Sequence, residues 1–210
     1  MSLFPMFLKL EGRSCLVVGA GKIGESKIRS LLVSRAKVHV IAPWATPTVT
    51  AWDRAGVLRW TAREFHPSDL GGVFLVVAAT SITAVNDVVY QEAQTRRALC
   101  NVVDVPDRCD FYYPAVVRRG DLQVAISTAG HSPALAQRLR REFERQLAPV
   151  YAGWLQGLGK IRRDLFSRRM DPEKRRSLLH AVAGGNPIEV ARLEVSKVNE
   201  PVAKGAAHGR

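Results

Sequence analysis

Short apolar runs alternate with amphipathic segments over the first half of the chain. Residues 14–18 form an apolar run that predicts a strand, and segment 23–34 places Ile28, Leu31 and Leu32 at helical spacing. The alternation continues with strands predicted at 37–41, 57–60, 73–79 and 99–103 and helices at 48–55 and 83–95. We expect a Rossmann-like, doubly wound α/β domain with a parallel sheet over residues 1–112.

The pattern changes after residue 112. Two strand-like runs, 111–117 and 122–128, flank the turn residues 118–121 and predict a β-hairpin. An amphipathic helix is expected from Pro133, and further helices are expected at 151–166, 174–183 and 187–195. We therefore expect a small hairpin and helix domain over 113–148, a helical C-terminal region over 149–195, and a disordered tail over 196–210.

Three glycines stand where the first strand gives way to the first helix. Gly19 permits a tight turn, Gly21 lets the backbone approach a pyrophosphate, and Gly24 lets the helix pack close to the strand. The free N–H groups at the helix start, around Lys22 and Ile23, favour phosphate. A G-x-G-x-x-G match alone is weak, but a strand before it and a helix after it indicate a dinucleotide site.

The usual acidic partner of this motif is absent. A carboxylate normally ends the second strand and binds the ribose hydroxyls, whereas this strand runs into Ala42, Pro43 and Trp44. The adenosine end of the dinucleotide would then be held by backbone groups there. The choice between NAD and NADP stays open at this point.

Asp104 follows the last strand of the predicted sheet, where ligands of parallel sheets bind. We expect its carboxylate to be poorly hydrated after an apolar strand, which suits a group that exchanges a proton. The alternative is that Asp104 only caps the loop before Pro106. Asn101, in the same strand, is a candidate substrate ligand or a residue that only orients a loop.

The segment Thr128-Ala129-Gly130-His131-Ser132-Pro133 places small and hydroxyl residues before a helix. Such a turn can hold a carboxylate at the helix N-terminus, so Thr128, Gly130, His131 and Ser132 are candidate substrate ligands. Plain capping by Ser132 explains the segment equally well.

The chain is strongly basic, with a net charge of +12. Between Arg118 and Arg176 there are 14 lysines and arginines against 6 acidic residues. A segment of this kind attracts anions such as nucleic acid, acidic lipid or a polycarboxylate, or it is simply a solvated helical face.

Composition also bears on metal binding and on the cellular location of the protein. The three cysteines, Cys15, Cys100 and Cys109, lack paired metal spacing, so we expect reduced thiols and no metal site. No apolar run approaches the roughly 20 residues of a membrane span, and the N-terminus does not resemble a signal peptide. We expect a cytoplasmic protein.

Several stretches together resemble the siroheme synthase family, and more narrowly its precorrin-2 dehydrogenase and sirohydrochlorin ferrochelatase module. The resemblance runs in order over residues 1–150 and becomes looser to about 195, and without a methyltransferase-like second half it is to a stand-alone form of the module. The stretches that carry it are Phe4-Pro5-Met6-Phe7-Leu8-Lys9-Leu10, Val17-Val18-Gly19-Ala20-Gly21, Ala78-Ala79-Thr80, Asn101-Val102-Val103-Asp104-Val105-Pro106 and residues 127–136.

The resemblance implies NAD-dependent oxidation of precorrin-2 to sirohydrochlorin, in some members followed by Fe²⁺ insertion, in a homodimer whose second domain forms part of the interface. It implies that Asp104 serves both steps, and that dinucleotide contacts fall at Lys22-Ile23 and Pro43-Trp44, with Thr80 beside them. Thr128 stands where a serine is common, and Ala129 and His131 alter the usual turn of small residues. These departures leave open the shape of the substrate loop and, with it, whether the chain inserts Fe²⁺.

Precorrin-2 carries acetate and propionate groups, so it would be a fitting anionic ligand for the arginine-rich segment. Two other functions are compatible with the sequence. One is a metal chelatase without dehydrogenase activity. The other is a non-catalytic dinucleotide sensor whose basic helices bind nucleic acid, although no groove-reading helix is recognisable and we expect no nucleic-acid partner.

Overall fold

The computed structural model describes residues 3–185 and 187. The helix expected at 187–195 and the tail expected at 196–210 lie outside the described residues, apart from residue 187. The chain divides into two compact units, one formed by Phe4–Tyr113 and the other by Leu3 with the chain from Pro114 onward. Each unit is described by itself.

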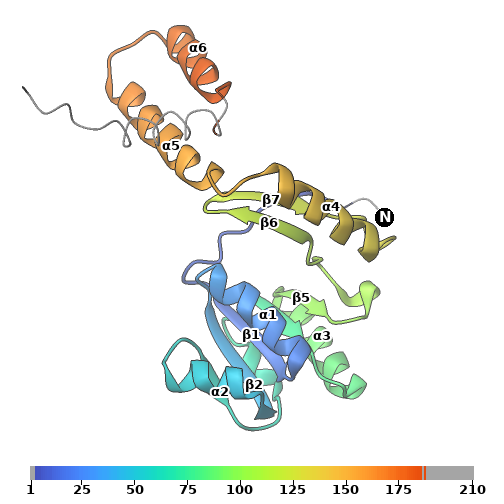
Figure 1. Cartoon of the computed structure of the whole chain (residues 1–210). Helices are drawn as coiled ribbons and strands as arrows, with labels where there is room; N and C mark the ends of the chain where they lie inside the picture. The colour runs from blue at the N-terminus through green and yellow to red at the C-terminus, as the bar shows by residue number, and fades with distance from the viewer. Residues whose placement is uncertain (1–2, 186, 188–210) are drawn as a thin grey trace, which may run out of the picture. The chain divides into compact units, whose positions relative to one another are not determined.

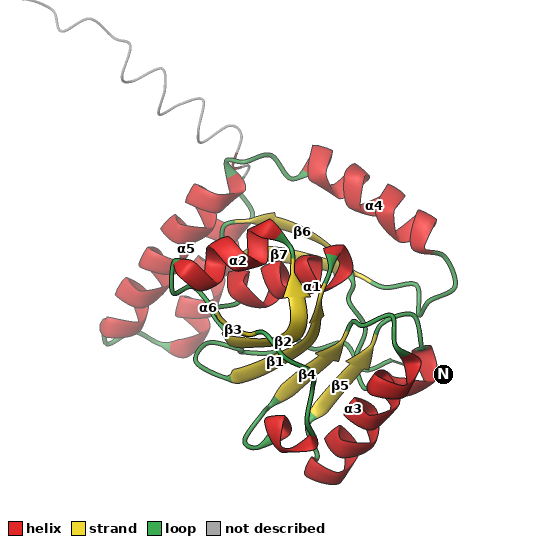
Figure 2. Ribbon diagram, turned by 90° about the horizontal axis from the view of Figure 1, so that it is seen from below, coloured by secondary structure: helices red, strands yellow, loops and turns green. Residues whose placement is uncertain are grey.

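The first unit is built on a five-stranded parallel sheet in the order β3-β2-β1-β4-β5 (Figures 1 and 2). Three α-helices and two short 3-10 helices connect the strands. The elements are β1 (Ser14–Ala20), α1 (Lys22–Val33), β2 (Lys37–Ala45), α2 (Pro47–Arg54), β3 (Arg59–Thr61), η1 (Pro67–Leu70), β4 (Leu75–Ala78), α3 (Thr83–Arg96), β5 (Leu99–Val102) and η2 (Pro106–Arg108).

Alternating side chains of the sheet build a core on each of its two faces. Cys15 and Val17 of β1 pack with Ile28 of α1 on one face, while Leu16 and Val18 belong to the cluster on the other. The second cluster contains residues of α3, and all these side chains are almost fully buried. Because successive residues of a strand point to opposite faces, one apolar run supplies both cores.

The strand β2 is longer than the pattern predicts and includes Pro43. Its register against β1 shifts, since Val18 pairs with Ile41 but Ala20 pairs with Ala45. Pro43 and Trp44 lie within this irregularity and have no register partner in β1. Proline has no N–H to donate, so a gap in the pairing is where a strand accepts it. The predicted strand 37–41 therefore ended too early, at the residue before this irregularity.

The second unit contains an antiparallel hairpin and three helices. The hairpin is formed by β6 (Ala115–Arg119) and β7 (Leu122–Ile126), and it is followed by α4 (Pro133–Gln146), α5 (Tyr151–Ser167) and α6 (Pro172–Ala183). The first hairpin strand begins later than the predicted residue 111. Residues Phe111 and Tyr113 pack instead against the core of the first unit.

One arginine fastens the hairpin to α4. The Arg119 guanidinium donates to the carbonyl oxygens of Leu147 at 2.6 Å and Glu144 at 2.7 Å, at the C-terminal end of that helix. Ala136 is the buried residue of α4, and the side chains of Leu135 and Phe143 remain 38% and 37% exposed. The observed elements confirm the predicted fold class, a Rossmann-like sheet followed by a hairpin and a helical region.

Candidate functional site

The strand order identifies where a ligand of the first unit would bind. The chain builds one half of the sheet from β1 outward to β3 and then crosses to β4 on the other side of β1. The switch in strand order therefore lies between the neighbouring strands β1 and β4. In such sheets the ligand crevice lies beyond the carboxyl ends of the strands at this switch point. The glycine turn follows β1, Thr80 follows β4 and Asp104 follows β5, so all three belong to the same edge of the sheet.

The glycine turn is packed too tightly for side chains. A Cβ on Gly19 would lie 2.5 Å from the carbonyl oxygen of Ala79, and Gly19 has a φ of +102°. A Cβ on Gly24 would lie 2.2 Å from the carbonyl oxygen of Gly19. The turn therefore lies against the end of β4 on one side and the first turn of α1 on the other, which requires glycine at both positions.

The start of α1 is built to face an anion. Gly21 is the N-cap residue, and within the described chain no side chain caps the first N–H groups of the helix, at Lys22 and Ile23. The positive end of the helix dipole is located there. A Cβ on Gly21 would lie 3.4 Å from the indole of Trp44, whose side chain is 65% exposed. Trp44 thus lies beside the glycine turn, as the candidate adenosine-binding segment requires.

Thr80 is held in place by a residue that the sequence reading did not identify. The Thr80 hydroxyl donates to Asn86 Oδ1 at 2.8 Å, and Asn86 Nδ2 donates to the Thr80 carbonyl oxygen at 3.0 Å. Asn86 is buried on α3. A polar residue on the inward face of a helix is the signal that would have found it.

Asp104 occupies a left-handed turn directly after β5. Its φ is +61°, a conformation that non-glycine residues seldom adopt and that is often found at functional sites. Its carboxylate is exposed, so the expectation of poor hydration was wrong for this chain by itself. The strand before it is apolar, but the turn carries the chain out of the sheet before the carboxylate is reached.

Lys27 is a further polar residue near Asp104 that the sequence reading did not identify. Its ammonium lies 3.9 Å from the centre of the Tyr113 ring. Burial lowers the pKa of Lys27, and the neighbouring negative charge of Asp104 partly opposes that shift. The signal in the sequence was its position on α1, one helical turn after Ile23.

Asn101 is buried and serves the loop that follows β5. Its amide donates to the Phe111 carbonyl oxygen at 2.8 Å and to Cys109 Sγ at 3.3 Å. These bonds fit the alternative in which Asn101 orients a loop.

The neighbouring Cys100 is buried in the same strand. Burial raises the pKa of Cys100 to about 12, so its thiol stays protonated at neutral pH.

The segment before α4 is a hydrogen-bonded turn in the second unit. The Ser132 hydroxyl accepts from the Leu135 N–H at 3.2 Å, and the Thr128 hydroxyl accepts from the Ser132 N–H at 3.2 Å. Ala129 and Gly130 both have positive φ, while the His131 N–H donates to the Thr128 carbonyl oxygen at 2.9 Å. Both hydroxyls of the candidate substrate loop therefore shape the turn itself.

Two further observations concern metals and membranes. Within residues 3–185 and 187, no three His, Cys, Asp or Glu side chains gather in a way that could hold a metal ion. None of the described helices has the length and apolar character that crossing a membrane requires.

Comparison with known proteins identifies both parts of the chain. Residues 6–115 match the family described as putative NAD(P)-binding, and residues 119–146 match the sirohaem biosynthesis protein central domain. Siroheme synthase 2 of Cronobacter sakazakii is 36% identical in an alignment that covers 96% of this chain and 46% of that protein. Siroheme synthase 1 of Aeromonas hydrophila is 41% identical over 163 residues, or 77% of this chain and 35% of that protein.

Among solved structures, the chain is similar to SirC, precorrin-2 dehydrogenase. The two share 29% sequence identity and superpose with a TM-score of 0.74 over 86% of this chain and 89% of SirC. The chain spans less than half the length of the two siroheme synthases it matches. The chain therefore belongs to the siroheme synthase family, and it corresponds to the N-terminal module, an NAD(P)-binding domain followed by the central domain.

Proposed function

We propose that the chain oxidises precorrin-2 to sirohydrochlorin, with NAD⁺ as the hydride acceptor. The observation that carries this proposal is the similarity to SirC, which extends over most of both chains and includes the region after the NAD(P)-binding domain. A shared Rossmann-like domain alone would support only dinucleotide binding.

The residues at the switch point fit a bound dinucleotide. Gly19 and Gly24 close a turn that any Cβ would disrupt, and Gly21 leaves its N-cap position open to a pyrophosphate. Lys22 and Ile23 would bind phosphate through the N–H groups of α1, while Pro43, Trp44 and Thr80 would flank the nucleoside ends. Because β2 ends without a carboxylate, the residues there do not choose between NAD and NADP. We favour NAD on the family resemblance and test NADP beside it.

When bound, NAD⁺ supplies a hydride acceptor. The substrate loses one hydride to it and one proton to the protein, so the products balance as sirohydrochlorin, NADH and H⁺. We assign the proton to a carboxylate oxygen of Asp104 because this residue follows β5 at the ligand edge of the sheet in a left-handed conformation. Lys27, whose ammonium lies against the Tyr113 ring, supplies a positive charge near Asp104.

The second unit would contribute to substrate binding and assembly. The turn formed by Thr128, Gly130, His131 and Ser132 would bind substrate carboxylates, and the hairpin with α4 would form the interface of a homodimer. Fe²⁺ would be a second substrate only if the same carboxylate also takes protons from the pyrrole nitrogens.

An anaerobic assay with precorrin-2 tests the function. We expect NADH and sirohydrochlorin to form together with NAD⁺, and NADP⁺ to serve as the comparison. In Asp104→Asn the rate should fall at least about a hundredfold, because a positioned general base contributes 10²–10⁴-fold, while NADH binding is retained. NADH formation at the wild-type rate would contradict the role of Asp104.

A parallel reaction with sirohydrochlorin and Fe²⁺ separates the alternatives. Siroheme formation without NAD⁺, in a protein that forms no NADH from precorrin-2, would indicate a chelatase and would overturn the dehydrogenase proposal.

A further inference from the structure

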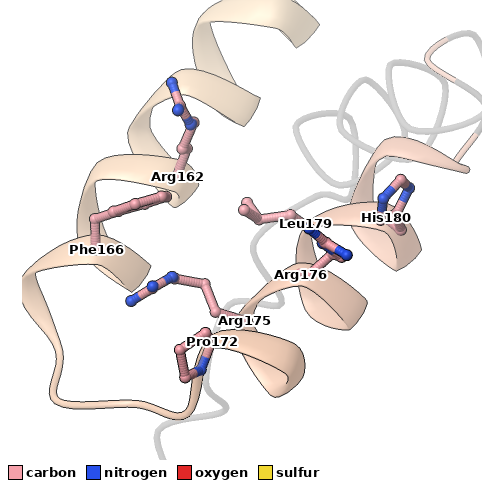
Figure 3. Close-up of a pocket in the computed structure, with 7 residues that line it drawn as sticks. All are labelled: Arg162, Phe166, Pro172, Arg175, Arg176, Leu179 and His180. Carbon is pink, nitrogen blue, oxygen red and sulfur yellow. The ribbon is translucent and has the colours of Figure 1, made fainter.

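A cavity of about 330 Å³ lies between α5 and α6 in the second unit (Figure 3). Its charged lining is entirely basic. Arg162 comes from α5, and Arg175, Arg176 and His180 come from α6. Of these, Arg162 and Arg175 contact the ring of Phe166. No carboxylate lines the cavity. A concave site that gathers cations without an acid favours an anionic ligand.

Phe166 brings the arginines of the two helices together. The Arg175 guanidinium lies 4.3 Å and the Arg162 guanidinium 5.1 Å from the centre of its ring. Arg175 reaches across from α6 toward this ring, as Figure 3 shows. Each guanidinium is held against the ring by a cation–π contact, so one residue of α5 keeps two positive charges at the cavity.

Two acidic residues near the facing ends of α5 and α6 are engaged elsewhere, and Glu173 in the first turn of α6 does not line the cavity. Asp164 pairs with Arg168 at 2.6 Å, and Asp171 caps the start of α6 by accepting from two backbone N–H groups at 3.0 Å. The contrast with α4 is clear, since Arg138 and Arg140 there pair with glutamates one turn along the helix. The N-terminal end of α6 also borders the cavity, at Pro172, but Asp171 and Glu173 offset the positive end of its dipole, so the positive potential comes from the arginines.

We propose that this cavity binds the acetate and propionate groups along one edge of the tetrapyrrole. The inference rests on the proposed function, which supplies a ligand with several carboxylates on one ring. Guanidinium groups can hold carboxylates bidentately, and Phe166 offers an apolar face to the macrocycle edge. The cavity is at the small end of the roughly 300–1,000 Å³ of ligand pockets, so it accepts an edge of the macrocycle and not the whole ring.

Binding of uroporphyrin III, a stable macrocycle with the same two kinds of carboxylate arm, tests the site without any reaction. The test variant is Arg175→Gln with Arg176→Gln in the full chain. The matched control is Arg163→Gln with Arg169→Gln, which removes the same charge from exposed residues that do not line the cavity. We expect the Kd for uroporphyrin, measured by its fluorescence, to rise about tenfold in the test variant and less than twofold in the control.

An equal effect in both variants would overturn the proposal, because it would show a nonspecific charge effect. Displacement of uroporphyrin by pyrophosphate at a far lower concentration would reassign the cavity to phosphate. Tighter binding of a single-stranded oligonucleotide, with the same arginine dependence, would reassign it to nucleic acid.

NADH formation from precorrin-2 is measured in the same preparations. Loss of uroporphyrin binding in the test variant supports the cavity even if the wild-type protein forms no NADH. The wild-type protein could oxidise precorrin-2 while the test variant keeps both its uroporphyrin affinity and its KM for precorrin-2. That result would overturn the proposal for the cavity and leave the proposed function standing.

Discussion

The glycine turn after β1 has no room for a methyl group at Gly24. In Gly24→Ala the added Cβ would meet the Gly19 carbonyl oxygen at 2.2 Å, and this oxygen is a backbone atom that cannot rotate away. We expect the free energy of unfolding to fall by about 3 kcal/mol and dinucleotide affinity to be lost. Urea unfolding and NADH fluorescence titration measure the two effects.

Gly157→Ala is the matched control, since nothing lies within 4 Å of a Cβ at this position in the middle of α5. It should stabilise the chain by about 0.5–1 kcal/mol and leave NADH binding unchanged. A Gly24→Ala protein as stable as the wild type would contradict the close packing of the turn.

Tyr113 carries a buried hydroxyl that has no hydrogen-bond partner among the described residues. Burial raises the pKa of this phenol. Tyr113→Phe keeps the ring that faces Lys27 and removes the unsatisfied group, so the free energy of unfolding should rise by about 1 kcal/mol. Urea unfolding provides the measurement.

Tyr112→Phe serves as the comparison because the exposed Tyr112 hydroxyl makes only a 3.4 Å bond to the Pro106 carbonyl oxygen. Its effect should stay within about 0.5 kcal/mol. Destabilisation by Tyr113→Phe would mean that the hydroxyl has a partner, such as a bound ligand or water.

At the scale of elements, the Arg119 side chain joins the hairpin to the end of α4. Arg119→Met removes two charge-assisted hydrogen bonds to backbone carbonyl oxygens and keeps the aliphatic stem. We expect a loss of about 2 kcal/mol in the free energy of unfolding, measured with urea. The neighbouring Arg118 is exposed, and Arg118→Met should change stability by less than about 0.5 kcal/mol. Equal effects in both variants would contradict the capping role.

The basic segment is also divided between different tasks at this scale. Arg119 caps a helix, Arg138 and Arg140 pair with glutamates, and the arginines between α5 and α6 face a cavity without an acid. Net charge alone could not separate these roles, because each depends on which side chains the helices bring together.

At the scale of the whole molecule, the hairpin suggests how two copies would meet. A two-stranded sheet is marginal by itself, and α4 leaves Leu135 and Phe143 more than one-third exposed. For the proposed homodimer we expect Leu135→Asp with Phe143→Asp to give a monomer, as measured by light scattering after size-exclusion chromatography.

The control pair is Ile161→Asp with Leu178→Asp, whose side chains are 40% and 38% exposed on α5 and α6. This variant should remain a dimer. A monomeric wild-type protein at micromolar concentration, or equal dissociation of both variants, would contradict an interface at α4.

The sequence by itself determined the order of strands and helices, the glycine turn, and the kind of ligand expected at that turn, a dinucleotide. These features follow from local periodicity and from the need for glycine where the backbone is crowded. The fold class and the position of Asp104 after β5 could both be predicted in this way.

Tertiary structure alone decided which side chains meet. The irregular pairing of β1 and β2 places Pro43 and Trp44 within a strand, the left-handed turn exposes Asp104, and α1 brings Lys27 to Tyr113. These outcomes depend on contacts between residues far apart in the chain, which local pattern does not encode. For the same reason, the glycine turn indicated a phosphate site from sequence, whereas the cavity between α5 and α6 became visible only in the structure.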